Sequence, residues 1–526
     1  MRIHILTNGR IYTGMPGHPW AEVMAIADGK VIALDQAALA WREAPDVMVE
    51  DLNRAFIMPS ISDAHIHLMW YARGLRELDL RDCSRAELVE RVQRRADTLS
   101  PGEWITGRGW DQNIWDDTSF PTATELDHAA PHHPVALRAK NGHALVANTA
   151  AIRAAGVDSQ TPDPVHGKIL RDERGEPTGI FLESAIGLIS QAKPAPSLDT
   201  LVDLLDEAQD HLLAFGITSV HDVDGPPAFE AMQELKRQGR LRIRIVKYIR
   251  REVLDAAIEA GLRSGFGDDK LRLGGLKLYA DGALGARTAA MFAPYEQEPD
   301  NVGLLTLDPE ELHDLARRAA SHGLQMAIHA IGDRANKLVV DALSSVREIA
   351  PALRHRVEHV QLIAPEDQRR LAHNGFIASM QPTHAVHDMR MADRYWGKRS
   401  QNAYAWRSIQ EAGATLAFGS DAPIEVFDPF LGLYAAVTRR SETNGDPGPE
   451  GWYPEQRLTL TEALRAFTWG AAYAAGMEKR LGLLVPGYYA DLAVLDRDIF
   501  SVPPEDLLKV KVRGVMVAGE WQDTDT

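Results

Sequence analysis

The sequence predicts an α/β protein built on a (β/α)8 TIM-like barrel, with a small β-sandwich formed by both chain termini and an insertion after the first barrel strand. The barrel is indicated by eight short β-rich runs, each followed by a helical stretch rich in Ala, Leu, Glu and Arg. Strand–helix alternation of this number is typical of a closed parallel sheet. With 526 residues, the chain can hold such a barrel and one or two smaller parts.

The two ends of the chain are read as short strands. Asn8-Gly9 and Asp28-Gly29 are hairpin-type turns between apolar stretches, and the C-terminal end contributes DLAVLDRD and VKVRGVMVAGEW. Neither end is large enough to form a good sheet alone. We therefore predict one composite β-sandwich from residues 1–57 and 477–526.

The barrel domain is predicted over residues 58–476. Its eight candidate strands lie in AFIMPSISDAHIHL, GITSVHDV, RIRIVKYI, LRLGGLKLYADG, GLQMAIHAIGD, HRVEHVQLI, FIASMQPTH and ATLAFGSDAP. The gap between the first two runs is too long for a single βα unit. It predicts an insertion over residues 69–213, placed over the active site.

Composition limits the partners and the compartment. The net charge of −17 argues against nucleic acid and anionic membranes as partners. No segment approaches the length of a membrane span, and the N-terminus lacks the pattern of a secretory signal. The single cysteine, Cys83, excludes an intrachain disulfide and fits a reducing compartment. We expect a cytoplasmic protein; a homodimer is an assembly that the sequence leaves open.

Residues able to bind metal stand at the ends of several predicted strands. His65 and His67 lie two positions apart in DAHIHL, so they point to the same side of a strand and can converge on a divalent ion. A lone HxH pair is a weak signal. Four further positions strengthen it, each after an apolar β-run and therefore at the C-terminal face of the barrel: Lys277, His329, His359 and Asp421. Taken singly, each has an ordinary explanation, such as capping the next helix.

The order HxH–Lys–His–His–Asp resembles the amidohydrolase superfamily. The local sequence motifs resemble those of its amidohydrolase-3, or YtcJ-like, branch, which includes N-substituted formamide deformylases. The matching segments include KLYADGALGARTA, HAIGDRA, FGSDAPIEVFDPF and GLLVPGYYADLAVLD, and they span nearly the whole chain. Asn141 departs from the pattern, where Asp is expected, which puts a substrate contact in doubt.

The resemblance implies a set of site residues. The implied metal ligands are His65, His67, His329, His359 and Asp421, with Lys277 as a bridging ligand when it is carbamylated. They imply one or two divalent ions, zinc first. Asp421 would move a proton to the leaving nitrogen, Lys277 would contribute through its carbamate, and His143 would be an oxyanion donor.

Substrate contacts are predicted at three places. Trp110, Asp111 and Trp115 lie in the insertion, where they either line an apolar pocket or belong to a core. Asp281 and Arg287 follow the Lys277 strand and either contact substrate or form a structural ion pair. Gln381 and His384, at the end of the seventh strand, face the barrel mouth by position.

The expected activity is metal-dependent hydrolysis of a non-peptide C–N bond, in an amide or N-substituted formamide, by a metal-activated water. The expected partner is a small-molecule amide. A deaminase or a cyclic-amide hydrolase on the same barrel is the alternative, and a non-catalytic regulatory relative is a third reading. No ligand-type residue of the pattern is missing, which argues against the third.

The shared face of His65 and His67 yields a first prediction. His65→Ala or His67→Ala should remove metal and activity together, while the barrel stays folded. Elemental analysis of the purified variants measures the metal. Full metal content in the double variant would contradict the assignment.

Overall fold

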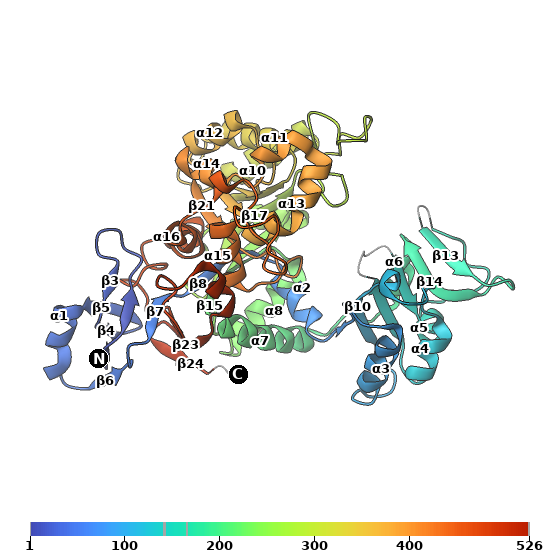
Figure 1. Ribbon diagram of the computed structural model, residues 1–526, viewed down its shortest axis with the longest axis horizontal. Helices are drawn as coiled ribbons and strands as arrows, with labels where there is room; N and C mark the ends of the chain where they lie inside the picture. The colour runs from blue at the N-terminus through green and yellow to red at the C-terminus, as the bar shows by residue number, and fades with distance from the viewer. Residues whose placement is uncertain (1, 140–143, 165–166, 524–526) are drawn as a thin grey trace. The chain divides into compact units, whose positions relative to one another are not determined.

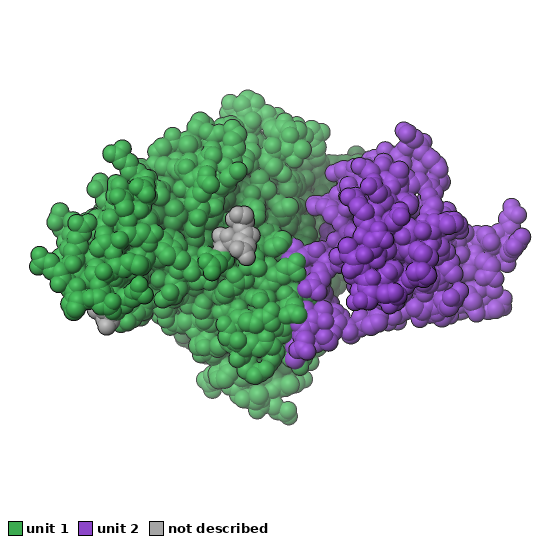
Figure 2. Space-filling view, turned by 90° about the horizontal axis from the view of Figure 1, so that it is seen from below, with its two compact units in different colours: residues 1–71, 201–526 green, residues 72–200 purple. Residues whose placement is uncertain are grey.

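The computed structural model describes residues 2–139, 144–164 and 167–523. It divides into two compact units (Figure 2). One unit comprises Met1–Tyr71 and Leu201–Thr526, and the other comprises Ala72–Thr200. The first unit contains the barrel and the strands of both termini.

The barrel is an eight-stranded sheet whose neighbouring strands are all parallel and follow one another in chain order, as the sequence predicts. Each strand lies within one of the eight predicted runs, except that β16 extends one residue beyond its run. The strands are β8 (Ile61–Ile66), β15 (Ile217–Asp222), β16 (Arg244–Arg250), β17 (Leu271–Tyr279), β18 (Met326–Ala330), β19 (Arg356–His359), β20 (Ile377–Met380) and β21 (Thr415–Phe418).

Backbone contacts just beyond β21 join the last strand to the first. The Asp421 amide donates to the His65 carbonyl at 2.7 Å, and the His67 amide donates to the Ala422 carbonyl at 2.9 Å. Glycine at position 419 permits this approach, because a Cβ atom there would lie 2.4 Å from the backbone nitrogen of His65. The nearly closed barrel therefore brings the first and last predicted ligands side by side.

Helices alternate with the barrel strands (Figure 1). Helix α10 shows why they form: Asp308 caps its N-terminus, Pro309 occupies the first turn, and apolar residues at helical spacing, such as Leu312 and Leu315, are buried. The barrel helices are α2 (Leu68–Gly74), α7 (Leu198–Ala214), α8 (Pro226–Arg237), α9 (Leu254–Glu259), α10 (Pro309–Ser321), α11 (Asp333–Ser345), α12 (Pro365–His373), α13 (Pro382–Trp396), α14 (Trp406–Glu411), α15 (Pro429–Thr438), α16 (Leu460–Arg465) and α17 (Ala471–Ala474). Within the described ranges, no helix combines the length and apolar character needed to cross a membrane.

Strands from the two termini form two further sheets, of four strands in the order β5-β4-β1-β6 and of six in the order β24-β23-β22-β7-β2-β3 (Figure 1). Apolar side chains of both sheets, including Leu6, Met24, Ile57 and Leu492, share one core. The strands are β1 (Ile3–Thr7), β2 (Arg10–Tyr12), β3 (Trp20–Ala21), β4 (Met24–Ala27), β5 (Lys30–Leu34), β6 (Val47–Asp51), β7 (Phe56–Pro59), β22 (Leu492–Leu495), β23 (Val512–Val517) and β24 (Glu520–Gln522).

The two predicted turns near the N-terminus have different outcomes. Asp28-Gly29 joins β4 and β5 in an antiparallel hairpin, which confirms that prediction. The Asn8-Gly9 hairpin is wrong, because β1 pairs with β4 and β6 whereas β2 pairs with β3 and β7. With the edges of both strands occupied by other partners, Asn8-Gly9 carries the chain from one sheet to the other.

The unit Ala72–Thr200 has a sheet and core of its own. Its strand order is β13-β14-β12-β11-β10-β9, and helices α3 (Arg85–Ala96) to α6 (Ile186–Ala192) accompany it. The strands are β9 (Leu78–Asp79), β10 (Ile105–Trp110), β11 (Val135–Ala139), β12 (Ala144–Ala147), β13 (Gly167–Arg171) and β14 (Pro177–Glu183). The unit is shorter than the predicted 69–213, because almost all of α7 belongs to the barrel unit and leads directly into β15.

Candidate metal centre

A cavity of about 600 Å³ lies at the C-terminal ends of the barrel strands. All the residues predicted as metal ligands line it: His65, His67, Lys277, His329, His359 and Asp421. Because the strands are parallel, their C-terminal residues meet at one end of the barrel, which is where active sites of this fold lie.

Two groups of ligand-type side chains converge on Asp421. In the first, the Nε2 atoms of His65 and His67 each lie 3.6 Å from its Oδ1. In the second, His384 Nε2 lies 3.6 Å from its Oδ2, and His359 is nearby. Within each group the ligand atoms lie within 4.8 Å of one another, a spacing that could hold a metal ion.

The rings of His65 and His67 are oriented by carboxylates behind them. Nδ1 of His65 donates to Glu358 at 2.5 Å, and Nδ1 of His67 donates to Asp224 at 3.0 Å. Each Nε2 is therefore left with its lone pair facing Asp421. Carboxylate partners of this kind fix the tautomer and orientation of metal-binding histidines.

The electrostatics of the cavity favour neutral nitrogen ligands. Burial, followed by the Lys277 charge, lowers the pKa of His65 to about 4. Burial and the neighbouring His329 lower the pKa of His359 well below its usual range. Both imidazoles are uncharged at neutral pH, so each retains a lone pair for a metal.

The donor set fits a divalent metal. His65 Nε2 and Lys277 Nζ are buried and have no hydrogen-bond partner among the described residues. Buried polar atoms without partners are costly, so a bound group that uses them would offset that cost. Imidazole nitrogens combined with a carboxylate suit zinc and similar ions.

Glu358 is a functional residue that the sequence analysis missed. Its side chain is fully buried and paired with Arg356, whose Nε and Nη2 donate to it at 2.6 and 2.8 Å. Burial alone raises the pKa of Glu358, but Arg356 and His65 together lower it well below its usual range. The signal was present, since the charged residues Arg356 and Glu358 flank Val357 in the candidate strand HRVEHVQLI.

Asp63 and Asp224 were also missed. One oxygen of the Asp63 carboxylate accepts the amides of His65 and Ser420, both at 3.0 Å, and the other accepts the Ser420 hydroxyl at 2.5 Å. Asp224 accepts the amides of Met69 and Trp70 as well as the His67 ring. Both acids hold the chain next to predicted ligands. Except for the His65 amide, which is two positions from Asp63, the partners named here lie more than 150 positions away in sequence.

The backbone is held in an uncommon conformation at two of these positions. Asp421 has φ = 62° and His359 has φ = 68°, a region that non-glycine residues use sparsely. Such conformations cluster at functional sites. Capping does not explain Asp421, because the next helix, α15, is capped by Asp428, whose carboxylate accepts the Phe430 amide.

His329 lies in the cavity but outside both converging groups. Its Nε2 donates to the Gly282 carbonyl at 2.9 Å. Gln381 does not line the cavity; its Oε1 accepts the Nδ1–H of His359 at 2.8 Å, which positions that ring. His384 does line the cavity, and Gln361 donates to its Nδ1 at 3.1 Å.

The other predicted substrate residues have structural partners. Asp281 accepts the backbone amides of Ala290, Ile331 and Gly332, whereas Arg287 pairs with Glu298 at 2.5 Å. The ion pair considered between Asp281 and Arg287 is therefore not formed. Each residue instead has its own partners in the loops after β17 and β18.

The predicted residues of the insertion belong to the smaller unit. Trp110 and Trp115 stack in its core, and their indole N–H groups donate to the Leu137 and Cys83 carbonyls. A core role accounts for both side chains. Asp111 is partly exposed. His143 and Asn141 lie outside the described residues.

Comparisons with known proteins show the family to which the chain belongs. Residues 48–521 match the model of the amidohydrolase family, so the chain belongs to this family. It is 31% identical to putative amidohydrolase YtcJ of Bacillus subtilis, covering 97% of this chain and 98% of that one. It is 28% identical to N-substituted formamide deformylase of Arthrobacter pascens, covering 99% and 98%.

A solved structure of a metal-dependent hydrolase has a similar fold and sequence. The crystal structure of an uncharacterized metal-dependent hydrolase from Pyrococcus horikoshii superposes with a TM-score of 0.82 at 30% identity, covering 95% of this chain and 99% of that one. The chain is thus an amidohydrolase-family protein with the fold of a metal-dependent hydrolase.

Replacing Glu358 tests whether the buried pair positions the centre. In Glu358→Gln, His65 loses its anionic partner, so metal affinity should fall by about 10- to 100-fold. Stability should fall by about 3–5 kcal/mol, because Arg356 is left buried and unpaired. Metal titration and denaturant unfolding measure the two effects.

Glu478→Gln is the matched control, because it removes an Arg–Glu pair with Arg354 that contacts no predicted ligand. Asp224→Asn provides a second route if Glu358→Gln does not fold, since it removes the carboxylate behind His67. Unchanged metal affinity in a folded variant of either acid would refute the positioning role.

Proposed function

We propose that the protein hydrolyses the C–N bond of a non-peptide amide, including an N-substituted formamide. The observation that carries the proposal is the convergence of four imidazoles on Asp421 in one open cavity, of which His65 and His359 are uncharged at neutral pH. The family and the named activity of the Arthrobacter relative support this class of reaction. A deaminase and a cyclic-amide hydrolase are the alternatives on this barrel, because the same fold serves several chemistries.

His65, His67, His329, His359 and Asp421 would hold one or two divalent ions, with zinc proposed first. An ion bound there supplies a water of lowered pKa, about 7, and polarises the carbonyl of the amide. Residues of this chain must then orient the substrate and move protons.

Asp421 is the proposed proton carrier. Its oxygens lie between the two histidine groups, so it can accept a proton from the attacking water and deliver it to the leaving nitrogen. Its carboxylate is nearly buried, and the backbone bond to His65 holds it in place.

We assign His384 to the substrate rather than to a metal. Gln361 donates to its Nδ1, so Nε2 carries the proton in the neutral ring. That N–H faces the cavity beside Asp421 and can donate to the carbonyl oxygen as negative charge develops.

Lys277 is proposed to act as a carbamate. Burial lowers its pKa to about 8, so a larger fraction of the amine is neutral at physiological pH than for an ordinary lysine. The neutral amine can attack CO2; a C–N bond forms, the amine loses a proton to solvent, and the resulting carbamate anion would supply oxygen atoms to hold a metal. A bare ammonium has no lone pair to offer a metal.

The proposed activity is tested by a substrate screen of the wild-type protein and by kinetic analysis of one variant, Asp421→Asn. Protein purified without chelator is analysed for metal and assayed with N-formyl and N-acyl amines, with cyclic amides and aminated heterocycles as competitors. In Asp421→Asn, kcat should fall by at least about 100-fold, because the amide cannot take a proton. Metal content should fall much less. Near-normal kcat with any amide substrate would exclude the proton-carrier role, and loss of all metal would make Asp421 chiefly a ligand.

Lys277→Ala should also lose activity, because the carbamate anion cannot form. Addition of a short carboxylate should restore part of it by entering the space left by the side chain. Lys277→Met, which is similar in length and uncharged, is the matched control and should not be rescued. A crystal structure with an unmodified Lys277 beside one well-occupied metal would contradict the carbamate and favour a mononuclear centre.

A further inference from the structure

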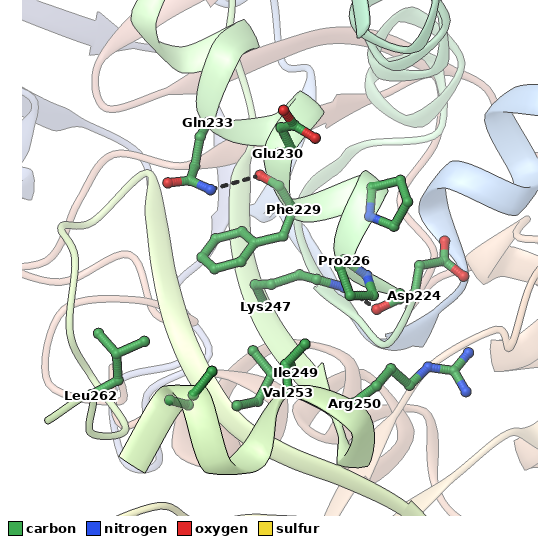
Figure 3. A pocket seen from close by; sticks show the side chains of 14 residues that line it. Asp224, Pro226, Phe229, Glu230, Gln233, Lys247, Ile249, Arg250, Val253 and Leu262 are labelled. Atoms are coloured by element: carbon green, nitrogen blue, oxygen red, sulfur yellow. Dashed lines mark hydrogen bonds between the residues drawn. The ribbon is translucent and has the colours of Figure 1, made fainter. Parts of the chain in front are cut away.

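A second cavity, of about 430 Å³, lies between α8 and α9 beside β16 (Figure 3). We call it the side cavity. Tyr248 of β16 contacts Arg356 inside the barrel, so its neighbours Lys247 and Ile249 face the opposite side of the strand. The side cavity is therefore outside the barrel wall, whereas the metal centre is at its mouth.

The walls of the side cavity are mainly apolar. They include Phe229, Ile249, Val253 and Leu262 (Figure 3). Its volume falls within the range of about 300–1,000 Å³ that is usual for small-molecule sites. A ligand group placed here would gain mainly from the removal of apolar surface from water.

The charges at its inner end are already paired. Lys247 donates to the Asp222 carboxylate and to the Asp224 carbonyl. The Asp224 carboxylate is used by His67 and two backbone amides. Neither the Lys247 ammonium nor the Asp224 carboxylate is left to select a charged ligand group. Glu230 and Arg250 also line the side cavity, and the apolar remainder of its walls favours an uncharged, apolar group.

The side cavity and the metal cavity share two residues, Asp224 and Arg250. Arg250 ends β16 and is in register with Lys277 on the next strand. Its guanidinium lies over the Tyr279 ring at 5.1 Å, and its Nε is buried without a hydrogen-bond partner among the described residues. The two cavities therefore adjoin at the end of β16, next to Arg250.

We propose that the side cavity binds the apolar substituent of the amide substrate. The inference rests on the proposed amide hydrolysis and adds the class of substrate: an amide with an extended, uncharged hydrocarbon group. Shared walls with the metal cavity favour this occupant over an independent ligand.

The test is a series of N-alkylformamides from N-methyl to N-octyl. In the wild-type protein, kcat/KM should rise by about two- to fourfold for each methylene that enters the side cavity. Ala256→Trp fills the cavity from an exposed position of α9 and should flatten the series, leaving N-methylformamide unaffected. Ala260→Trp is the matched control, since Ala260 is exposed at the end of the same helix and does not line the cavity.

A flat series in the wild-type protein, or an equal slope in Ala256→Trp and Ala260→Trp, would overturn the proposal. Failure of the proposed activity is recognised separately, by the absence of turnover throughout the series. In that case the affinity for N-octylformamide is measured by calorimetry. Weaker binding in Ala256→Trp, but not in Ala260→Trp, supports the side cavity as a binding site. Equal binding in both variants, or none in the wild-type protein, refutes it.

Discussion

The buried ion pair between Arg356 and Glu358 is the interaction on which the metal centre depends. Arg356 is fully buried, and its guanidinium bonds to groups on five barrel strands: Ala64 on β8, His221 on β15, Tyr248 on β16, Glu358 on β19 and Ser379 on β20. Glu358 in turn holds His65. Desolvating two charges costs several kcal/mol each, and such a pair is tolerated when its hydrogen bonds are complete. The barrel interior thereby fixes the geometry at its mouth.

Asp421 takes part both in the closure of the barrel and in the candidate metal centre. Its backbone amide bonds to β8, while its carboxylate faces both histidine groups. The close approach that Gly419 permits is therefore also what places the carboxylate. A change that loosened the seam between β21 and β8 would disturb the proposed proton carrier, so stability and activity are coupled at this point.

Asp224 and Arg250 connect the metal centre with the side cavity. Asp224 orients His67 through its side chain and receives Lys247 through its carbonyl. Arg250 lines both cavities at the end of β16. If the side cavity holds part of the substrate, recognition and metal positioning use the same short segment after β15. Selectivity for the substituent would then affect the catalytic step as well as binding, because a displaced Asp224 also displaces His67.

The sequence by itself determined the eight barrel strands and the residues His65, His67, Lys277, His329, His359 and Asp421 that line the cavity. Strand periodicity and the position of a residue at the C-terminal end of a strand can be read from local sequence, and the family motifs supported the same residues. Only the tertiary structure decided which groups orient them. Glu358 and His65 are 293 positions apart, and Asp224 and His67 are 157 apart. Such pairs depend on how strands align around a closed barrel, which no local pattern records. The same reason explains the Asn8-Gly9 turn, where pairing with distant strands overrode a local hairpin signal.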